Sequence, residues 1–299
     1  MRLLVLGRSG QVGWELQRSL APLGDVVALS RADADLEDID ALLQIVRRER
    51  PQVLVNATGY TAVDRAEGEP HRADKINRAA VDALARWAAT ADASLVHYST
   101  DYVFDGRKPA PYVESDDTAP QSVYGRTKRD GEVAIIASGC QHLIFRTSWV
   151  HAARGSNFVR TILRLAKERS ELRIVADQFG APTSAELIAD ITAIAIAAFT
   201  TGRTSLPSGI YHLTAGGKTT WYDFARFIIA EAAERGAQLR TTVDAIAPIG
   251  SSQYPTAATR PANSMLDTGK LKAALGINLP DWTVHARRSV AELLEGTTA

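Results

Sequence analysis

A glycine-rich turn directly after an apolar run constrains this chain more than any other feature of its sequence. Arg2 to Leu6 has the composition of a short strand, Gly7 to Gly13 (GRSGQVG) follows, and Trp14 to Leu20 has helical spacing. Glycine lacks a Cβ atom, so its backbone can turn tightly and approach a pyrophosphate, whose charge suits the amides at a helix amino-terminus. The order strand, glycine turn, helix therefore predicts a doubly wound α/β fold that binds a nucleotide.

The end of the second predicted strand is expected to choose the cofactor. Val26 to Leu29 is followed by Ser30 and Arg31, and Asp33 and Asp35 come soon after. At this position an acidic side chain binds the adenosine 2′-hydroxyl of NADH, whereas an arginine favours the 2′-phosphate of NADPH. Arg31 therefore predicts NADPH. The aspartates leave NADH open, and the alternative for Arg31 is a solvated side chain with no role in binding.

Two further predicted strands carry small or polar residues at their carboxyl ends. Val53 to Asn56 leads into Ala57 to Thr61, and Leu95 to Tyr98 ends in the polar segment Ser99 to Asp101. Parallel sheets bind their ligands beyond the carboxyl ends of the strands. Both segments are therefore expected to line the cofactor site.

The segment SVYGRTK places Tyr124 and Lys128 near the start of a predicted helix. On a helix these side chains lie one turn apart on one face. A fixed ammonium beside a phenol is expected to favour the phenolate and to bring the pKa of Tyr124 nearer to neutrality. The spacing alone is a weak signal, because it also arises by chance. With Thr100 at a preceding strand end, it predicts a triad of Thr100, Tyr124 and Lys128.

Composition argues against several classes of function. The 34 basic residues balance 34 acidic residues, which gives no reason to expect a nucleic-acid partner. The apolar run from Leu3 is too short for a signal peptide or a membrane span, and the single cysteine, Cys140, excludes an intramolecular disulfide. The histidines show no pair at metal-ligand spacing and are interpreted as structural. We therefore expect a cytoplasmic protein with no membrane partner.

The second half of the chain is predicted to build a smaller lobe, apart from one helix that returns to the sheet. The Ala- and Ile-rich segment from Ser184 to Phe199 is expected to be wholly buried, which favours a place against the sheet. We therefore expect residues 1–148, with the helix of about 184–199, to form a Rossmann-type dinucleotide-binding domain with a doubly wound parallel sheet. Residues 149–183 and 200–299 are expected to form a smaller, mixed α/β substrate domain.

Motifs along nearly the whole chain resemble one family. Three of them, in this order, resemble the extended short-chain dehydrogenase/reductase superfamily acting on nucleotide sugars: Gly7-x-x-Gly10-x-x-Gly13, Ser99 to Phe104 (STDYVF) and Tyr124-x-x-x-Lys128. Three more look like the dTDP-4-dehydrorhamnose reductase family: Phe145 to Val150 (FRTSWV), Asp177 to Thr183 (DQFGAPT) and Arg260 to Ser264 (RPANS). The likeness implies a nicotinamide-dependent reduction of dTDP-4-dehydro-6-deoxy-L-mannose at its 4-keto carbon, the last step towards dTDP-L-rhamnose for cell-surface polysaccharides.

The resemblance also implies roles for particular residues. It makes Thr100, Tyr124 and Lys128 catalytic, and the residues that it places at the substrate are Thr100, Asp101, Trp149 and Arg260. Arg260 suits a diphosphate because its planar fork matches phosphate oxygens, with a structural salt bridge as the alternative. The residues expected at the cofactor are Gly7, Gly10, Gln11, Val12, Gly13, Ser30, Arg31, Asp35, Leu36, Ala57, Gly59, Tyr60, Thr61, Tyr98, Tyr124 and Lys128.

Two details of the family pattern concern metal and cofactor choice. Members can bind a magnesium ion at a dimer contact through glutamates, and Glu15 and Glu186 sit at comparable places here. Mg²⁺ and a homodimer are therefore expectations of the resemblance, while scattered glutamates are usually solvated. Ser30 stands where other members carry an acid, which argues against strict use of NADH.

Three other functions stay open on the sequence. A nucleotide-sugar 4,6-dehydratase has the same fold but carries a Thr-Asp-Glu cluster, whereas Tyr102 here takes the place of the glutamate. A nucleotide-sugar epimerase would keep its cofactor tightly bound through purification. The regulatory subunit of methionine adenosyltransferase resembles the reductase family and acts as a binding partner. The presence of Thr100, Tyr124, Lys128 and Trp149 favours an enzyme over such a subunit.

Overall fold

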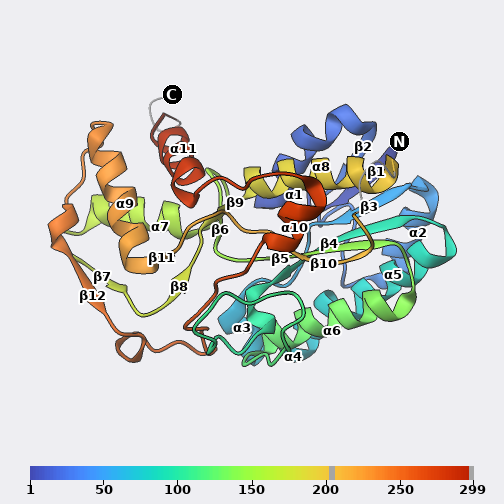
Figure 1. The fold of residues 1–299 in the computed structure, drawn as a ribbon, viewed down its shortest axis with the longest axis horizontal. Coiled ribbons are helices and arrows are strands. Elements are labelled where there is room, and N and C mark those ends of the chain that lie inside the picture. The colour runs from blue at the N-terminus through green and yellow to red at the C-terminus, as the bar shows by residue number, and fades with distance from the viewer. Residues whose placement is uncertain (202–205, 296–299) are drawn as a thin grey trace.

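The computed structural model describes residues 1–201 and 206–295. Its main sheet has six parallel strands in the order β10-β5-β4-β3-β1-β2 (Figure 1). These strands are β1 (Arg2–Leu6), β2 (Asp25–Leu29), β3 (Val53–Asn56), β4 (Ser94–Thr100), β5 (His142–Thr147) and β10 (Gly209–His212). From β1 the chain goes to β2 on one side, and it then crosses to β3 on the other side of β1. This change of direction between β1 and β3 is the place where doubly wound sheets bind their ligands.

Both faces of the main sheet are buried, as the alternation of side chains along β1 shows. Leu3 and Val5 belong to one apolar cluster, and Leu4 and Leu6 belong to another. The first cluster includes side chains of α1 (Gln11–Leu20) and α8 (Ala185–Thr201). The second is covered by α2 (Ile39–Glu49), α5 (Ala80–Thr90) and α6 (Val123–Ser138), on the opposite side of the sheet (Figure 1). The doubly wound parallel fold expected from the sequence is therefore confirmed.

Helix α8 returns from the second half of the chain to the main sheet. It packs against α1 and shares an apolar cluster with Leu3 and Val5 of β1, which agrees with the expectation that this segment lies against the sheet (Figure 1). The expectation that this helix is wholly buried is wrong, because the side chain of Ile194 is 43% exposed. A helix that lies on the outside of a layer keeps one face open to solvent even when most of its residues are apolar.

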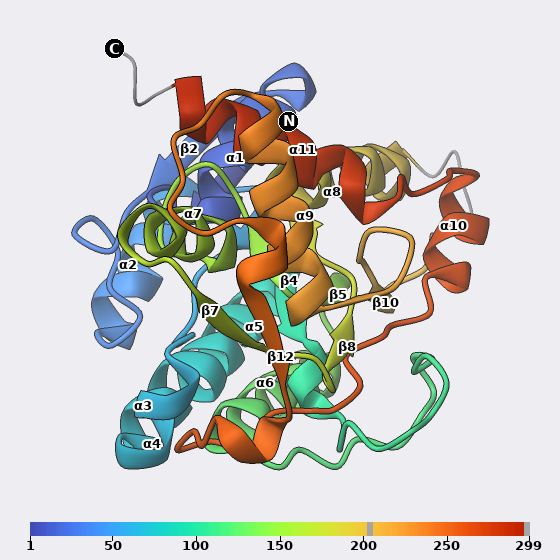
Figure 2. The same cartoon turned by 90° about the vertical axis from the view of Figure 1, so that its left-hand side faces the viewer.

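A second region beside the sheet contains three longer helices, α7 (Phe158–Glu168), α9 (Trp221–Glu234) and α11 (Trp282–Glu295) (Figures 1 and 2). Phe224 of α9 is fully buried against Phe158 and Trp282. The short strands pair as β7 (Leu172–Val175) with β12 (Ile246–Ile249), β6 (Val150–His151) with β9 (Thr183–Ser184), and β8 (Phe179–Gly180) with β11 (Thr219–Thr220). Helix α10 (Gly269–Leu275) does not belong to this region, because it lies against α8 and against β10 of the main sheet.

One strand lies on the other side of the expected domain boundary. β10 comes from residues 200–299, which were assigned to the lobe, yet it pairs in parallel with β5 as an edge strand of the main sheet. The pairing satisfies the edge of β5, which would otherwise present unpaired backbone groups. The boundary therefore has to place β10 with the first domain.

Short helices and turns connect these elements. They are α3 (Val63–Gly68), α4 (Pro70–Asp74), the π-helix Lys75–Ala79 and the 3₁₀ turns Ala21–Leu23, Asp101–Val103, Val243–Ala245 and Ser251–Gln253. Among the helices of residues 1–201 and 206–295, none combines the length and apolar character needed to cross a bilayer.

Candidate active site

A cleft of about 740 Å³ lies beyond the carboxyl ends of β1, β3 and β4. It is lined by most of the residues that the sequence placed at the cofactor or the substrate: Gly7, Gly10, Gln11, Val12, Arg31, Asp35, Leu36, Ala57, Gly59, Thr61, Tyr98, Thr100, Asp101, Tyr124, Lys128 and Trp149. Four others do not line it, namely Gly13, Ser30, Tyr60 and Arg260. The structure thus brings distant segments of the chain to one place.

The glycine turn between β1 and α1 is closed by contacts that only glycine allows. Gly7 has a φ of +96°, and the Gly10 amide donates to its carbonyl oxygen at 2.9 Å. A Cβ atom on Gly13 would lie only 2.1 Å from that same oxygen. Gly13 therefore holds the turn shut rather than lining the cleft. The turn leaves the amino-terminus of α1 at the cleft, where backbone amides suit a pyrophosphate.

Helix α6 brings Tyr124 and Lys128 to the end of β4. Its amino-terminus is capped by Ser122, whose hydroxyl accepts from the Gly125 amide at 3.1 Å. Gly125 lies so close to the Tyr102 carbonyl that a Cβ atom there would meet it at 2.2 Å. The first turn of α6 is thereby held against the segment that follows Thr100, and Thr100, Tyr124 and Lys128 all line the cleft.

The electrostatics of this group differ from the expectation. Burial raises the pKa of Tyr124 to about 12, and a hydrogen bond with Thr100 opposes that shift only in part. The expectation that Lys128 brings the phenol nearer to neutrality is wrong here, because the cost of desolvating a phenolate is larger. Burial also lowers the pKa of Lys128 to about 8. At neutral pH Tyr124 is therefore a protonated phenol, able to donate a proton.

The ammonium of Lys128 is held by β4. Its Nζ donates to the Tyr98 carbonyl oxygen at 2.6 Å and lies 3.0 Å from Nε2 of His97. His97 is buried, and its Nδ1 lies 3.2 Å from the side-chain nitrogen of Asn56. Burial, with the charge of Lys128, keeps the pKa of His97 well below its ordinary value, so the ring is neutral. Sequence reasoning treated this histidine as structural and missed its contact with Lys128.

Asn77, in the π-helix Lys75–Ala79, ties the loop after β3 to α6. Its side-chain oxygen accepts from the Tyr60 amide at 2.8 Å, and its side-chain nitrogen donates to the Thr127 hydroxyl at 3.1 Å. π-Helical turns often occur at functional sites. No sequence signal marked Asn77, because it begins a regular apolar stripe. Tyr60 itself is buried, and its hydroxyl donates to Glu69 at 2.9 Å instead of lining the cleft.

Asp101 presents a buried carboxylate to the cleft. Burial raises its pKa to about 6, against hydrogen bonds from Ser264 and Thr100. Its Oδ2 has no hydrogen-bond partner among the described residues. A buried acceptor of this kind suits a ligand hydroxyl.

Trp149 is fixed in an uncommon backbone conformation at the cleft. Its φ is +50°, which a bulky residue rarely adopts. The indole stacks on Trp221 with ring centroids 3.5 Å apart and planes 12° apart. On its other side lies Gly180, where a Cβ atom would come within 2.5 Å of the indole Cε2. The ring is thus held between two elements of the second region.

Arg260 pairs with Asp64 beside the cleft. Its Nη2 donates to Asp64 Oδ2 at 2.5 Å, which matches the salt bridge considered as an alternative to phosphate binding. Its Nη1 is buried and has no hydrogen-bond partner among the described residues. One arm of the guanidinium is therefore engaged by Asp64, and the charge of Arg260 also acts on Tyr102, whose pKa it lowers against the effect of burial.

The end of β2 differs from a simple binding site for the cofactor ribose. Ser30 is turned to Asp33, which accepts from both its amide and its hydroxyl at 2.9 and 2.7 Å. Arg31 and Asp35 line the cleft and bond each other, with 3.1 Å between Nε and Oδ2. Arg31, the residue that would favour NADPH, is thus paired with Asp35, the residue that would favour NADH.

Glu15 and Glu186 lie near each other but do not form a metal site. Burial raises the pKa of Glu15, and the charge of Glu186 adds to that shift. Glu186 forms an ion pair with Arg288 at 2.9 Å. The part of the chain that the structure describes contains no group of three or more His, Cys, Asp or Glu side chains placed to hold a metal ion. These residues therefore do not fit a Mg²⁺ site within one chain.

Known proteins resemble this chain over its full length. The family described as the RmlD substrate binding domain matches residues 1–295. The dTDP-4-dehydrorhamnose reductase of Burkholderia thailandensis is 50% identical over 296 residues, which cover 98% of this chain and 99% of that protein. The crystal structure of a dTDP-4-dehydrorhamnose reductase from Clostridium acetobutylicum has a TM-score of 0.88 at 32% identity and covers 100% of both chains. The enzyme of that name from Bacillus anthracis, solved in complex with NADP, has a TM-score of 0.87 at 32% identity, with 97% and 99% of the chains covered.

Proposed function

The chain belongs to the dTDP-4-dehydrorhamnose reductase family, and we infer from this membership that it catalyses the reaction for which the family is named. It reduces the 4-keto carbon of dTDP-4-dehydro-6-deoxy-L-mannose, and dTDP-β-L-rhamnose is the product. The enzyme is an NAD(P)H-dependent oxidoreductase of dTDP-L-rhamnose and polysaccharide biosynthesis. The observation that carries this function is the meeting of the glycine turn with Thr100, Tyr124 and Lys128 in one cleft.

We propose that Tyr124 donates the proton that the reaction needs. When bound, the nicotinamide supplies the hydride to the ketone carbon, and negative charge grows on the ketone oxygen. The phenol of Tyr124, whose pKa is raised to about 12, is protonated and lines the cleft. Transfer of its proton neutralises the growing charge, the duty of a general acid.

Thr100 and Lys128 are proposed to support this transfer in different ways. The Thr100 hydroxyl interacts with the phenol and can hydrogen-bond the same ketone oxygen. Lys128, held by the Tyr98 carbonyl and His97, places a positive charge one helical turn from Tyr124. That charge stabilises the phenolate formed once the proton has left.

The residues present fit a dinucleotide. The tightly packed glycine turn leaves the amino-terminus of α1 accessible at the cleft, where it would hold the diphosphate. Arg31 and Asp35 would face the adenosine ribose, and Lys128 would face the nicotinamide ribose. We propose NADPH as the cofactor because Arg31 lines the cleft, with NADH as the alternative that Asp35 supports.

The substrate sugar is proposed to lie between Thr100, Asp101 and Trp149. The unpaired Asp101 oxygen can accept from a sugar hydroxyl, and Nη1 of Arg260 can bind a diphosphate oxygen. Residues 149–183 and 200–299, without β10, are proposed as the substrate domain.

The direct test supplies dTDP-4-dehydro-6-deoxy-L-mannose with NADPH or NADH and follows the loss of reduced-nicotinamide absorbance. We expect stoichiometric oxidation of the cofactor and formation of dTDP-L-rhamnose. Absence of turnover with both cofactors would contradict the function. A preparation that retains its dinucleotide and interconverts sugars without net oxidation would instead indicate an epimerase.

Two further expectations are kept as proposals. A homodimer is tested by light scattering of the purified chain, and a cytoplasmic location by cell fractionation. Mg²⁺ is not part of the proposed function, and the reductase is expected to remain active in EDTA.

A further inference from the structure

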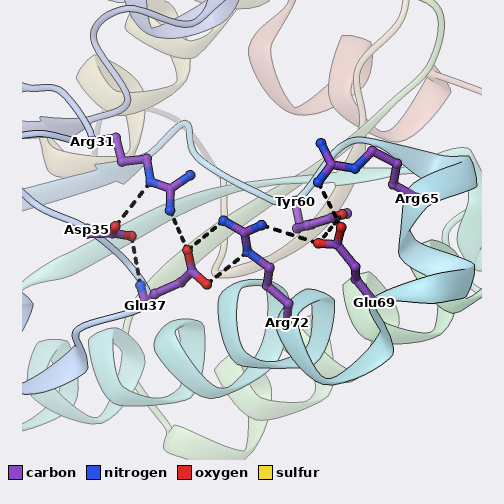
Figure 3. A network of polar contacts seen from close by, with 7 residues as sticks. All are labelled: Arg31, Asp35, Glu37, Tyr60, Arg65, Glu69 and Arg72. Carbon is purple, nitrogen blue, oxygen red and sulfur yellow. Dashed lines mark hydrogen bonds and ion pairs between the residues drawn. The ribbon is translucent and has the colours of Figure 1, made fainter.

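A chain of ion pairs closes the adenosine end of the cleft (Figure 3). Arg31, which follows β2, donates from Nε to Asp35 and is also paired through Nη2 with Glu37. Glu37 is gripped from the opposite side by Arg72 of α4, which donates from Nε and Nη2 to its two oxygens at 2.9 and 3.0 Å. Two segments far apart in the sequence thus hold one carboxylate in place.

The grip on Glu37 is itself anchored. Arg72 donates from Nη1 to Glu69 at 3.3 Å, and Glu69 accepts from Arg65 at 2.7 Å and from Tyr60 at 2.9 Å (Figure 3). The hydrogen bonds from Arg72 are the main cause that lowers the pKa of Glu37. Glu37 is therefore charged at neutral pH and has little freedom to leave Arg31.

Arg31 is consequently not a free receptor for phosphate. Two of its nitrogens, Nε and Nη2, are already used by carboxylates, although its side chain is 62% exposed. A 2′-phosphate that approaches Arg31 has to share or displace these partners, and it is repelled by both negative charges. The 2′-hydroxyl of NADH brings no charge and meets neither cost.

We propose that Glu37, held by Arg72, sets the cofactor preference of this reductase by restraining Arg31. With the carboxylate in place, the advantage that Arg31 gives to NADPH is reduced, and the enzyme accepts both cofactors. Glu37 does not line the cleft and acts through Arg31, so it is a positioning residue. The proposal rests on the proposed function only in requiring that the chain binds a nicotinamide dinucleotide.

The test measures dissociation constants by calorimetry, without substrate. The probes are NADPH, NADH and the fragment pair adenosine 2′,5′-bisphosphate and 5′-AMP. In Glu37→Gln, we expect the preference for NADPH over NADH to increase about fivefold, since the interaction of an exposed ion pair corresponds to at most that change. The fragments should show the same shift, because, like NADPH and NADH, they differ by the 2′-phosphate, and neither contains the nicotinamide.

Glu69→Gln is the matched control. It removes one negative charge from the same network and from the same Arg72, but Glu69 does not contact Arg31. We expect its NADPH preference to stay within about twofold of the wild type, because a charge beyond a direct contact is screened. Arg31→Gln should lower the preference for NADPH and should abolish the effect of adding Glu37→Gln.

Three results overturn the proposal: an unchanged preference in Glu37→Gln, an equal shift in Glu69→Gln, or a shift that persists without Arg31. Glu37→Ala carries the same expectation if the glutamine variant does not fold. A wild-type chain that binds neither dinucleotide contradicts the proposed function itself. A wild type that binds both while Glu37→Gln changes nothing contradicts only this inference.

Discussion

The two ends of the cleft use charge in opposite ways. At the proposed catalytic end, Tyr124 and Lys128 are surrounded by protein, and burial is the main cause of the change in each pKa. At the end where we propose that adenosine binds, Arg31 is largely exposed, and direct ion pairs lower the pKa of Glu37. Removal from water thus shifts proton affinities at one end, while compensating partners hold charges in place at the other.

This difference predicts how each end responds to change. A buried group has few ways to replace a lost partner, so substitutions there should have large effects that salt does not alter. Exposed ion pairs are screened and can be replaced by water, so substitutions there should have smaller, salt-dependent effects. Four experiments can break or sharpen this contrast.

The largest effect is expected at the buried phenol. Tyr124→Phe removes the proposed proton donor, and kcat should fall by about 10²–10⁴. The dissociation constant for NADPH should change only a few-fold, since the ring remains. Steady-state absorbance and calorimetry measure the two quantities. Tyr254→Phe, at an exposed tyrosine outside the cleft, is the control and should leave both unchanged. A Tyr124→Phe variant with nearly normal kcat would remove Tyr124 from the mechanism.

The second experiment compares the stability of two ion pairs. Glu132, one turn beyond Lys128, forms a pair with Arg146 in which both side chains are only 3% exposed. Glu132→Gln leaves a buried guanidinium without its counter-charge and should lower the free energy of unfolding by about 3–5 kcal/mol. Glu37→Gln at the exposed end should cost much less. Urea denaturation measures both, and equal losses would contradict the contrast.

The third experiment is the pH dependence of the reduction. Lys128 has its pKa lowered to about 8, so its stabilising charge is present below that pH and is lost as the pH rises through it. We expect kcat at saturating cofactor to fall roughly tenfold per pH unit above that point. The phenol, with its pKa raised to about 12, cannot cause a fall in this range.

The variant Lys128→Arg tests whether the titration of Lys128, and not that of another group, causes the decline of kcat. A guanidinium stays charged throughout, so any activity left in this variant should no longer decline near pH 8. A decline that is unchanged in Lys128→Arg would assign the titration to another group.

The smallest effect is expected from salt. Between about 0.05 M and about 0.5 M NaCl the screening length falls from about 14 to about 4 Å, so the influence of Glu37 on NADPH preference should shrink to about twofold. The pH at which kcat begins to decline should remain nearly constant, because Lys128 is buried. The comparison would be contradicted if the pH at which kcat declines shifted with salt while the effect of Glu37→Gln on NADPH preference stayed constant.

Local patterns in the sequence were sufficient for the fold and for part of the site. Gly7 and Gly13 predict the turn because a turn is formed by residues that are close in the sequence. Tyr124 and Lys128 lie on one helix face because of their spacing alone. The distant partners could not be predicted. Glu37 and Arg72 look like ordinary surface charges until the fold brings them together. His97 looks like any strand residue until Lys128 of α6 reaches it.

The wrong prediction for the pKa of Tyr124 also arises because the sequence does not show which groups the fold brings together. The sequence predicts an ammonium near the phenol, but the solvent exposure of the two groups cannot be predicted from it. In the structure, burial raises the pKa of the phenol, and Lys128 is bonded to Tyr98 and His97. Desolvation depends on all surrounding elements, so no single motif reports it.

Gly180 lies close to the indole of Trp149, which we propose to contact the sugar, and this closeness couples the two positions. Any side chain at position 180 would collide with the indole, so the two sites form an epistatic pair. A mutant library that randomises position 180 alone should consist mostly of inactive clones. One that varies 149 and 180 together gives access to pockets of altered shape, and engineering for other deoxysugars should begin with that pair.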